Sequence, residues 1–257
     1  MRKNPVKDFG PIADDYAFFE RHATEAEEDA RSYLERLRDI APADGPIRML
    51  DFGCGSGSFT ARLLREAKWP AERLRLTLVE PAELARRQAV GQLAGYTSTP
   101  IADSSAVPAG STASFDIVLA NHSLYYVPDL RRELARLIDA LFHPGIFLCA
   151  IAGRANALIQ LWITAFGLLG SEIPYHTSED VEKALQELGA EHDKHQVSFE
   201  LTFPDSEENR MRIIRFLLAD HLSQMPLDSL LASFDRYSRS GRIRVPTTSD
   251  HFTIHVA

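Results

Sequence analysis

The amino-acid sequence predicts an α/β protein built around a Rossmann-like, doubly wound sheet of seven strands. The first observation is an apolar run that enters a glycine-rich turn, from Met49 to Ser58. The second is another apolar run about twenty residues further on, Leu76 to Val79, which ends in the acid Glu80. The third is the alternation of strand-like and helix-like segments that follows, a pattern typical of parallel βαβ units.

A chain of 257 residues, 45% of them hydrophobic, suits one such domain with an appended region. We divide it into an N-terminal helical lid (1–44), a core that carries the glycine turn (45–155), and substrate-side helices with the final strands (156–257). Within the lid, residues 12–40 are predicted to be helical because apolar residues recur among charges at helical spacing. The proline- and glycine-rich stretch 41–46 separates this helix from the first strand.

The remaining elements follow from the same periodicities. A helix begins after the turn (59–67), and another begins at Thr177 or Ser178, whose side chains suit an N-cap, and ends at Gly189. The stretch from 206 to 238 is mostly helical and separates the last two strands. The predicted strands cover residues 47–53, 74–80, 97–101, 115–121, 146–152, 195–203 and 251–256.

The glycine turn has the spacing G-x-G-x-G, and Asp51 precedes its first glycine by two residues. A dinucleotide fingerprint spaces its glycines as G-x-G-x-x-G and needs a helix N-terminus free of competing anions. A carboxylate at this position would repel a pyrophosphate, but it suits a ligand with an ammonium and a sulfonium group. The turn therefore favours S-adenosylmethionine (SAM) over NAD or FAD.

Each part of SAM can be assigned to residues at the ends of the first strands. The glycines let the backbone pass close to the methionine moiety, and Asp51 holds its ammonium directly or through water. Glu80 accepts both ribose hydroxyls, since an unpaired carboxylate at the end of an apolar strand would be costly. Asp103 accepts from the adenine amine. The predicted cofactor-binding set is Asp51, Gly53, Gly55, Gly57, Glu80, Pro81, Asp103, Ser104, Asn121 and Tyr16.

Composition narrows the function classes. The net charge of −8 argues against a nucleic-acid substrate, which usually requires a basic face. No run of 18 apolar residues predicts a membrane span, and the N-terminus has no signal-peptide core. Two cysteines, both expected to be buried at separate strand ends, indicate a reducing, cytoplasmic setting. The oligomeric state cannot be derived from the sequence.

Two other polar clusters are interpreted as solvated surface. The arginines at 236, 239, 242 and 244 are expected on an exposed loop or helix face. The acids and histidines at 191–195 are expected in a solvated loop after Gly189, so no metal site is predicted.

The chain resembles the class I SAM-dependent methyltransferases. The resemblance covers about residues 45 to 155 and implies the seven-stranded fold and the cofactor, but no substrate. It is carried by Leu50-Asp51-Phe52-Gly53-Cys54-Gly55-Ser56-Gly57, Val79-Glu80-Pro81, Phe115-Asp116-Ile117-Val118 and Pro144-Gly145-Ile146-Phe147-Leu148.

A narrower resemblance, to histamine N-methyltransferase, extends over most of the chain. It implies that Glu25 contacts the amine side of a substrate and that Tyr125, Tyr126 and Trp162 help to form an aromatic pocket. The sequence departs from that family at two positions. It has His122 where the family has a glutamine, and Asp250 where the family has an imidazole-binding asparagine. The matching segments are His22-Ala23-Thr24-Glu25, Tyr125-Tyr126-Val127-Pro128-Asp129, Leu161-Trp162, Thr177-Ser178-Glu179-Asp180-Val181 and Phe252-Thr253-Ile254.

Asn121 and His122 end the fourth strand, beside the position of the transferable methyl group in this fold. Asn121 can offer its carbonyl oxygen to a substrate amine or to SAM. His122 is the best candidate for a general base because its ordinary pKa lies near neutrality, and the alternative is a structural, hydrogen-bonded histidine. Methyl transfer to a neutral amine needs little base catalysis, because alignment removes most of the barrier.

Aromatic residues complete the predicted pocket. Tyr125, Tyr126, Trp162 and Tyr175 could form a cage whose ring faces stabilise a cation, and the alternative for each is plain core packing. Tyr16 and Phe19 belong to the N-terminal helical segment, which either covers the cofactor as a lid or packs permanently on the sheet edge.

These features predict an enzyme of biosynthesis, a transferase that moves the SAM methyl group to a small molecule, at an amine nitrogen rather than an oxygen. A second hypothesis makes SAM the only substrate: its α-amine attacks its own γ-carbon and gives azetidine-2-carboxylate and methylthioadenosine. A third is a non-catalytic SAM-binding protein.

Overall fold

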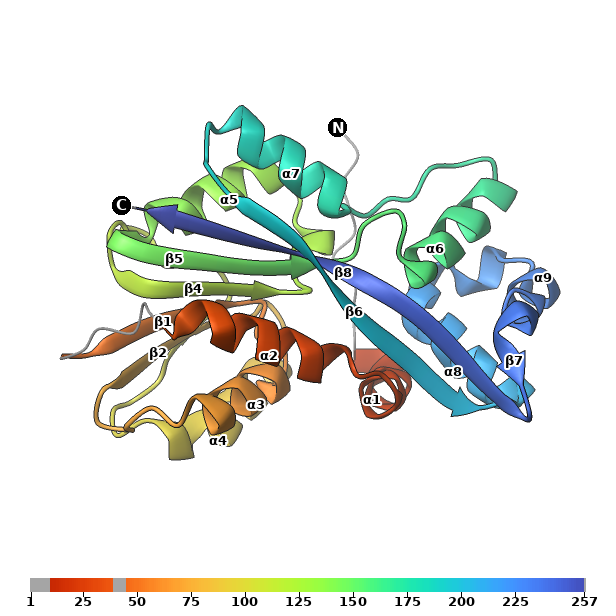
Figure 1. The fold of residues 1–257 in the computed structure, drawn as a ribbon, viewed down its shortest axis with the longest axis horizontal. Coiled ribbons are helices and arrows are strands. Elements are labelled where there is room, and N and C mark those ends of the chain that lie inside the picture. Colours follow the sequence, from red (N-terminus) through yellow and green to blue (C-terminus); the bar gives the residue numbers. More distant parts are fainter. Residues whose placement is uncertain (1–9, 39–44, 257) are drawn as a thin grey trace.

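The computed structural model describes residues 10–38 and 45–256, and its centre is one mixed sheet (Figure 1). The strand order is β3-β2-β1-β4-β5-β8-β6, with a short β7 paired to β8. β1 to β5 are parallel, whereas β8 runs antiparallel to both β5 and β6. The predicted sheet of seven main strands is confirmed, although the third strand lies outside its predicted range, and β7 is an addition. The strands are β1 (Ile47–Phe52), β2 (Leu74–Val79), β3 (Ala102–Ser104), β4 (Phe115–Asn121), β5 (Leu141–Ile151), β6 (Asp193–Pro204), β7 (Ser238–Arg239) and β8 (Arg242–Val256).

Three strand boundaries differ clearly from the prediction, and one of them is the start of β5, at Leu141 rather than 146. The third strand is Ala102–Ser104 rather than 97–101, because Pro100 has no N–H to donate and the Thr97 hydroxyl binds the Leu74 carbonyl instead of pairing as a strand residue. β8 begins at Arg242, well before the predicted start at 251, because the basic stretch alternates exposed arginines with buried residues and pairs with β6.

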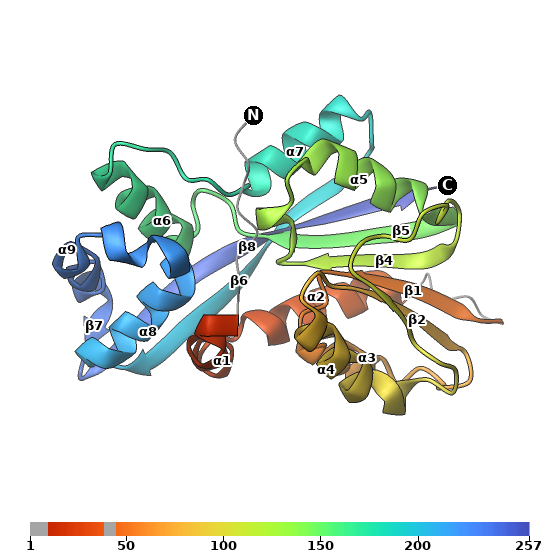
Figure 2. The same ribbon diagram turned by 180° about the vertical axis from the view of Figure 1, so that it is seen from behind.

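Helices cover both faces of the sheet, as expected of a doubly wound fold (Figures 1 and 2). Successive strand residues point to opposite faces of the sheet and so belong to two apolar cores. Met49 packs with α2, α3 and α4, whereas Leu50 packs on the opposite face with α5 and α7. The helices are α1 (Ala13–His22), α2 (Glu25–Leu37), α3 (Ser58–Ala67), α4 (Glu83–Leu93), α5 (Leu130–Asp139), α6 (Ala157–Leu168), α7 (Ser178–Glu187), α8 (Glu207–Leu218) and α9 (Leu227–Ala232), with short 3-10 turns η1 (Gly10–Ile12), η2 (Ala94–Tyr96), η3 (Leu124–Tyr126), η4 (Ala219–Gln224) and η5 (Asp235–Tyr237).

β6 and β8 continue past the rest of the sheet as a two-stranded ribbon, which carries α6, α8 and α9 at its far end (Figure 1). This ribbon lobe, made of α1, α6, α8, α9 and the outer halves of β6 and β8, shares one continuous core with the α5–α7 face. Among the described residues, no helix combines the length and apolarity that a membrane crossing requires.

The stretch 12–40, predicted to be helical, forms two helices within its described residues, since the chain breaks between α1 and α2. Ala23 is extended and bridges to Leu201 of β6, while Thr24 exchanges hydrogen bonds with Glu200: its N–H donates at 3.0 Å and its Oγ1 accepts at 3.0 Å. The break sends α1 towards α8 and makes Glu25 the first residue of α2.

Side chains hold α1 on the ribbon lobe. The buried carboxylate of Asp15 accepts from Arg215 at 2.9 and 3.1 Å and from Arg212 at 3.4 Å. The ring of Phe19 stacks on Phe216 with centroids 4.7 Å apart. α1 is therefore packed against α8. The ends of the predicted lid, residues 1–9 and 39–44, lie outside the described residues.

Candidate active site

The three glycines of the turn after β1 have different structural roles. All have positive φ, between +52° and +85°. A Cβ on Gly53 would lie 2.2 Å from the Ser123 Cβ, and one on Gly57 would lie 3.0 Å from the Ala89 Cα. A Cβ on Gly55 would meet nothing within 4 Å. Packing alone thus accounts for Gly53 and Gly57, and Gly55 is the position with open space for a ligand.

Glu80 follows β2 and faces this turn. Its carboxylate accepts hydrogen bonds from the Gly55 N–H at 3.1 Å and the Ala82 N–H at 2.9 Å. A carboxylate has about four lone-pair positions, so two are left for further donors. Two vicinal ribose hydroxyls match that remaining capacity. Pro81 comes next and is exposed.

Asp51 ends β1 beneath the turn. It is 3% exposed, and its carboxylate accepts from the Thr60 hydroxyl of α3. Burial raises the pKa of Asp51 to about 6, the Thr60 hydrogen bond opposes this rise, and the charge of Glu80 adds to it. A nearby cation would lower that pKa and hold Asp51 ionised.

Asp103 and Ser104 lie on β3, and both have protein partners. Asp103 is half-exposed and pairs with Arg86 of α4 at 2.8 Å, which the sequence did not predict. Arg86 also donates to the Glu80 carbonyl at 2.6 Å, so it connects the acidic turn to β3. Ser104 donates to the Ala106 carbonyl. An adenine amine would share the Asp103 carboxylate with Arg86.

Asn121 ends β4 and His122 follows it, on the strand next to β1 and its glycine turn. His122 has a φ of +51°, an unusual backbone conformation for a residue with a Cβ. The Asn121 amide donates to Asp29 at 3.4 Å, which fixes the amide orientation because a carboxylate can only accept. Asn121 Oδ1 is consequently a buried acceptor with no hydrogen-bond partner among the described residues.

Sequence reasoning missed two site residues, one of which is His251 of β8. The other is Asp29, which lies one turn after Glu25 on α2. It has no exposed surface, and it accepts from His122 Nε2 at 3.0 Å and from His251 Nε2 at 2.8 Å. His122 Nε2 also lies 3.6 Å from Glu25 Oε1. The spacing of four residues, which places Glu25 and Asp29 on one helix face, was the available signal. We name Glu25, Asp29, Asn121, His122 and His251 the acid–histidine cluster.

Charges in this cluster set its protonation. Burial opposes the charged form of His122, but the carboxylates of Glu25 and Asp29 outweigh it and raise the His122 pKa to about 9. Burial raises the pKa of Glu25 to about 7, although the His122 charge lowers it. Asp29 is also desolvated, yet the two histidines hold its pKa at about 2. His122 is therefore protonated near neutral pH, which argues against its predicted role as the general base. Glu25 is the group poised to exchange a proton there.

The four predicted aromatic residues are brought together as a closed set of neighbours. Ring centroids are 5.7 Å apart for Tyr125–Tyr126, 5.0 Å for Tyr126–Tyr175, 4.8 Å for Trp162–Tyr175 and 5.7 Å for Tyr125–Trp162. Trp162, Tyr175 and Tyr125 are buried, and Trp162 Nε1 donates to the Leu217 carbonyl at 2.8 Å. These three are packed as core, so the half-buried Tyr126 is the ring best placed to meet a ligand.

Tyr125 also joins the aromatic set to the cluster. Its hydroxyl accepts from the Ala152 N–H at 2.8 Å and lies 3.0 Å from His122 Nδ1. Tyr16 of α1 approaches from the other side: burial raises its pKa, and the charges of Glu20 and Glu25 and the neighbouring Tyr126 raise it further. Phe19 is 5% exposed and stacks on Phe216 in the α1–α8 packing, so its predicted contact with the substrate stays a prediction.

Asp250 does not join the cluster. Neighbouring strand residues point to opposite faces, so His251 reaches Asp29 while Asp250 accepts from Ser178 and pairs with Lys194 at 3.4 Å. Asp250 lines a surface hollow of about 490 Å³ on that other face. The acids and histidines at 191–195 lie partly in β6 rather than in a loop, with His195 bonded to Ser32 at 2.9 Å.

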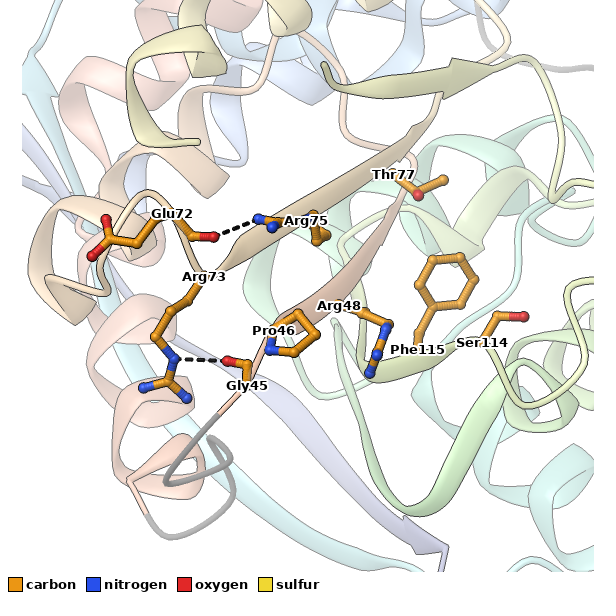
Figure 3. Close-up of a pocket in the computed structure, with 9 residues that line it drawn as sticks. All are labelled: Gly45, Pro46, Arg48, Glu72, Arg73, Arg75, Thr77, Ser114 and Phe115. Carbon is orange, nitrogen blue, oxygen red and sulfur yellow. Dashed lines mark hydrogen bonds between the residues drawn. The ribbon is translucent and has the colours of Figure 1, made fainter. Parts of the chain in front are cut away.

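A larger hollow of about 710 Å³ lies at the opposite edge of the sheet (Figure 3). Arg48, Arg73 and Arg75 line it at the amino ends of β1 and β2, away from the glycine turn. The described residues contain no group of three or more His, Cys, Asp or Glu side chains that could hold a metal ion. Both cysteines are free; Cys149 is buried, but Cys54 is only half-buried, contrary to the prediction.

The glycine turn after β1, the acid after β2 and the polar cluster after β4 define an α/β enzyme that binds an adenosine ligand at the carboxyl edge of its sheet. The family profile described as "Methyltransferase domain" matches residues 21–195. The chain therefore belongs to the methyltransferase domain family, a family of SAM-dependent enzymes with SAM as cosubstrate. The residues present fit SAM: open space at Gly55, spare lone pairs on Glu80, and an unpartnered acceptor on Asn121.

Known proteins are similar to this chain in sequence or in fold. The trans-aconitate 2-methyltransferase of Rhodopseudomonas palustris is 32% identical over 134 residues, 52% of this chain and 47% of the relative, so the match spans about half the relative's length. The YcgJ protein of Bacillus subtilis has a TM-score of 0.58 at 14% identity, covering 88% of this chain and 98% of that one. A possible histamine N-methyltransferase of Thermotoga maritima has a TM-score of 0.54 at 14% identity, covering 97% and 98%.

Proposed function

We propose that this protein transfers the methyl group of SAM to the nitrogen of a small basic amine. The observation that carries the proposal is the acid–histidine cluster. With Glu25 ionised, the carboxylates of Glu25 and Asp29 outnumber the single positive charge on His122, so these three side chains together carry a net negative charge. A cationic amine complements that charge.

The same charge separates this proposal from the activity named for the bacterial relative. Trans-aconitate carries several carboxylates, and two buried acids beside the acceptor position would repel it. The cluster thus favours a cation over a polyanion as the acceptor.

Glu25 has the proton affinity that the reaction needs. An ammonium group has no lone pair, so it must lose a proton before it can attack. With its pKa near 7, Glu25 can take that proton at neutral pH, after the amine has paired with it. SAM supplies an electrophilic methyl group: a nitrogen–carbon bond forms, the carbon–sulfur bond breaks, and its electron pair stays on sulfur.

Other residues bind and orient. Asn121 Oδ1 accepts from an N–H of the acceptor or of the SAM ammonium, and Tyr126 offers a ring face to the cation. Glu80 holds the ribose, Gly55 admits the ligand, and α1 and α2 cover the cofactor. Pairing two reactants in this way supplies most of the rate acceleration in a displacement reaction.

The test is an incubation of the protein with SAM, alone and with separate acceptors, followed by identification of the nucleoside product by mass. The acceptors are histamine, further small primary amines and trans-aconitate. S-adenosylhomocysteine formed only with an amine supports the proposal. Its formation with trans-aconitate alone, or methylthioadenosine formed without any acceptor, overturns it in favour of O-methylation or SAM cyclisation.

A further inference from the structure

We infer that Asp29 is a positioning residue for the acceptor pocket: its buried carboxylate fixes His122 as an imidazolium, and the imidazolium keeps Glu25 available for the acceptor's proton. The part of this inference that concerns the acceptor's proton rests on the proposed function. The hydrogen bonds of Asp29 and their effect on His122 do not depend on that function.

The groups that are hydrogen-bonded to the Asp29 carboxylate all act as donors. Oδ2 accepts from His122 Nε2 at 3.0 Å and from the Asn121 amide at 3.4 Å, and Oδ1 accepts from His251 Nε2 at 2.8 Å. Because an ionised carboxylate only accepts, both histidine Nε2 atoms must carry hydrogen. Asp29 therefore fixes the tautomer of one histidine on β8 and one after β4.

His122 is enclosed by groups from three elements. Glu25 and Asp29 approach its Nε2 from α2, Tyr125 of η3 lies 3.0 Å from its Nδ1, and His251 of β8 reaches it through Asp29. The Tyr125 hydroxyl already accepts from the Ala152 N–H, and its remaining lone pair can accept from His122 Nδ1. Both ring nitrogens of His122 thus face acceptors, an arrangement that suits the doubly protonated ring.

The protonated ring controls Glu25. Glu25 Oε1 lies 3.6 Å from His122 Nε2, and from outside the cluster it accepts a weak hydrogen bond from Ser249 Oγ at 3.5 Å. Without a positive His122, burial and the charge of Asp29 would both favour the protonated form of Glu25, which cannot take a proton from an ammonium group. Asp29 thus acts on the reaction through His122 and Glu25 and does not touch the acceptor.

The test is Asp29→Asn, which retains the shape and removes the charge. In the protein alone, without SAM or acceptor, the histidine ring protons are followed by NMR as pH is raised. We expect the His122 midpoint to fall by about one pH unit or more, because an opposite charge at this range shifts a pKa by about 1–3 units. With SAM and an amine, kcat should fall about tenfold or more while the Kd for SAM changes less than about twofold.

The matched control is Asp205→Asn. Like Asp29, Asp205 is a carboxylate that accepts several side-chain hydrogen bonds, from Arg210 and the Ser238 hydroxyl, but it is only half-buried and lies after β6 in the ribbon lobe. The inference is overturned if His122 keeps its midpoint in Asp29→Asn, or if Asp205→Asn shifts it equally. If Asp29→Asn does not fold, the wild-type titration decides: a His122 midpoint above about 8 supports the inference, and one at or below its ordinary value of about 6.5 refutes it.

The titration requires no turnover, so its result is independent of the proposed reaction. A shifted His122 in a protein that methylates no amine would retain Asp29 as the organiser of the cluster and reject the proposed function alone.

Discussion

Replacing Glu80 with glutamine tests the cofactor site with the least change in shape. Both Glu80 oxygens accept from backbone N–H groups, at 3.1 Å from Gly55 and 2.9 Å from Ala82. A glutamine amide must present its NH₂ to one of these donors, and it also loses the charge that a ribose diol would meet. Hydrogen bonds to charged groups contribute about 1.5–3 kcal/mol each. We therefore expect SAM to bind about 2–3 kcal/mol more weakly, or roughly 30- to 150-fold in Kd.

Isothermal titration calorimetry measures this loss directly, and circular dichroism verifies that the variant is folded. Glu83→Gln is the control: Glu83 is an exposed acid three residues further on, paired with Arg87 on the surface of α4, and its loss should leave the Kd for SAM unchanged. A folded Glu80→Gln protein with a Kd within threefold of the wild type would refute the placement of the ribose.

Four further substitutions test cofactor binding, the stability of the fold and the proton affinity of Glu25 separately. Gly55→Val should abolish SAM binding in calorimetry, because its side chain would fill the open approach; retained binding would place the ligand elsewhere. Asp51→Asn should weaken SAM more than adenosine, and equal losses would mean that Asp51 only shapes the turn. Trp162→Phe removes a hydrogen bond from α6 to α8 and should cost about 1–2 kcal/mol of unfolding free energy in urea titrations; an unchanged free energy would contradict the packing role. Burial raises the pKa of Glu25 from 4.5 to about 7, so the folded state binds its proton more tightly and loses stability as pH rises through that window. Glu25→Gln should therefore gain stability relative to the wild type, by up to about 3 kcal/mol, between about pH 4.5 and 7, and parallel pH curves would refute this.

The fold could be predicted because its signals are local. The glycine turn, the acid after β2 and the alternation of strands with helices are each contained in short windows, and the sheet order follows from parallel crossovers. The strand boundaries were harder to predict from the sequence. β8 pairs with β6 from Arg242 to Thr253, and that long-range pairing stabilises residues 242–250 as a strand despite their many polar side chains.

The acid–histidine cluster could be predicted only in part, because it is assembled by tertiary structure. Glu25 and His122 were identified separately, from a resemblance and from the end of a strand. Asp29 and His251, distant in sequence, meet only when α2 packs on the sheet beside β8. The protonation of His122 could not be predicted for the same reason: its ordinary pKa applies to an isolated side chain, whereas two buried carboxylates surround it here.

The ribbon of β6 and β8 separates two regions of the chain that contribute to different parts of the site. The glycine turn, Asp51 and Glu80 belong to β1, β2 and the segments that follow them, whereas Trp162 and the partners of α1 come from the lobe that the ribbon carries. Changes in the ribbon lobe can therefore reshape the aromatic wall around Trp162 without altering the cofactor side, because Glu25, Asp29 and His122 belong to α2 and the end of β4. Chimaeras that exchange residues 156–257 between members of this family should keep SAM binding and the preference for a charged acceptor, and should change the shape of the acceptor that is accepted.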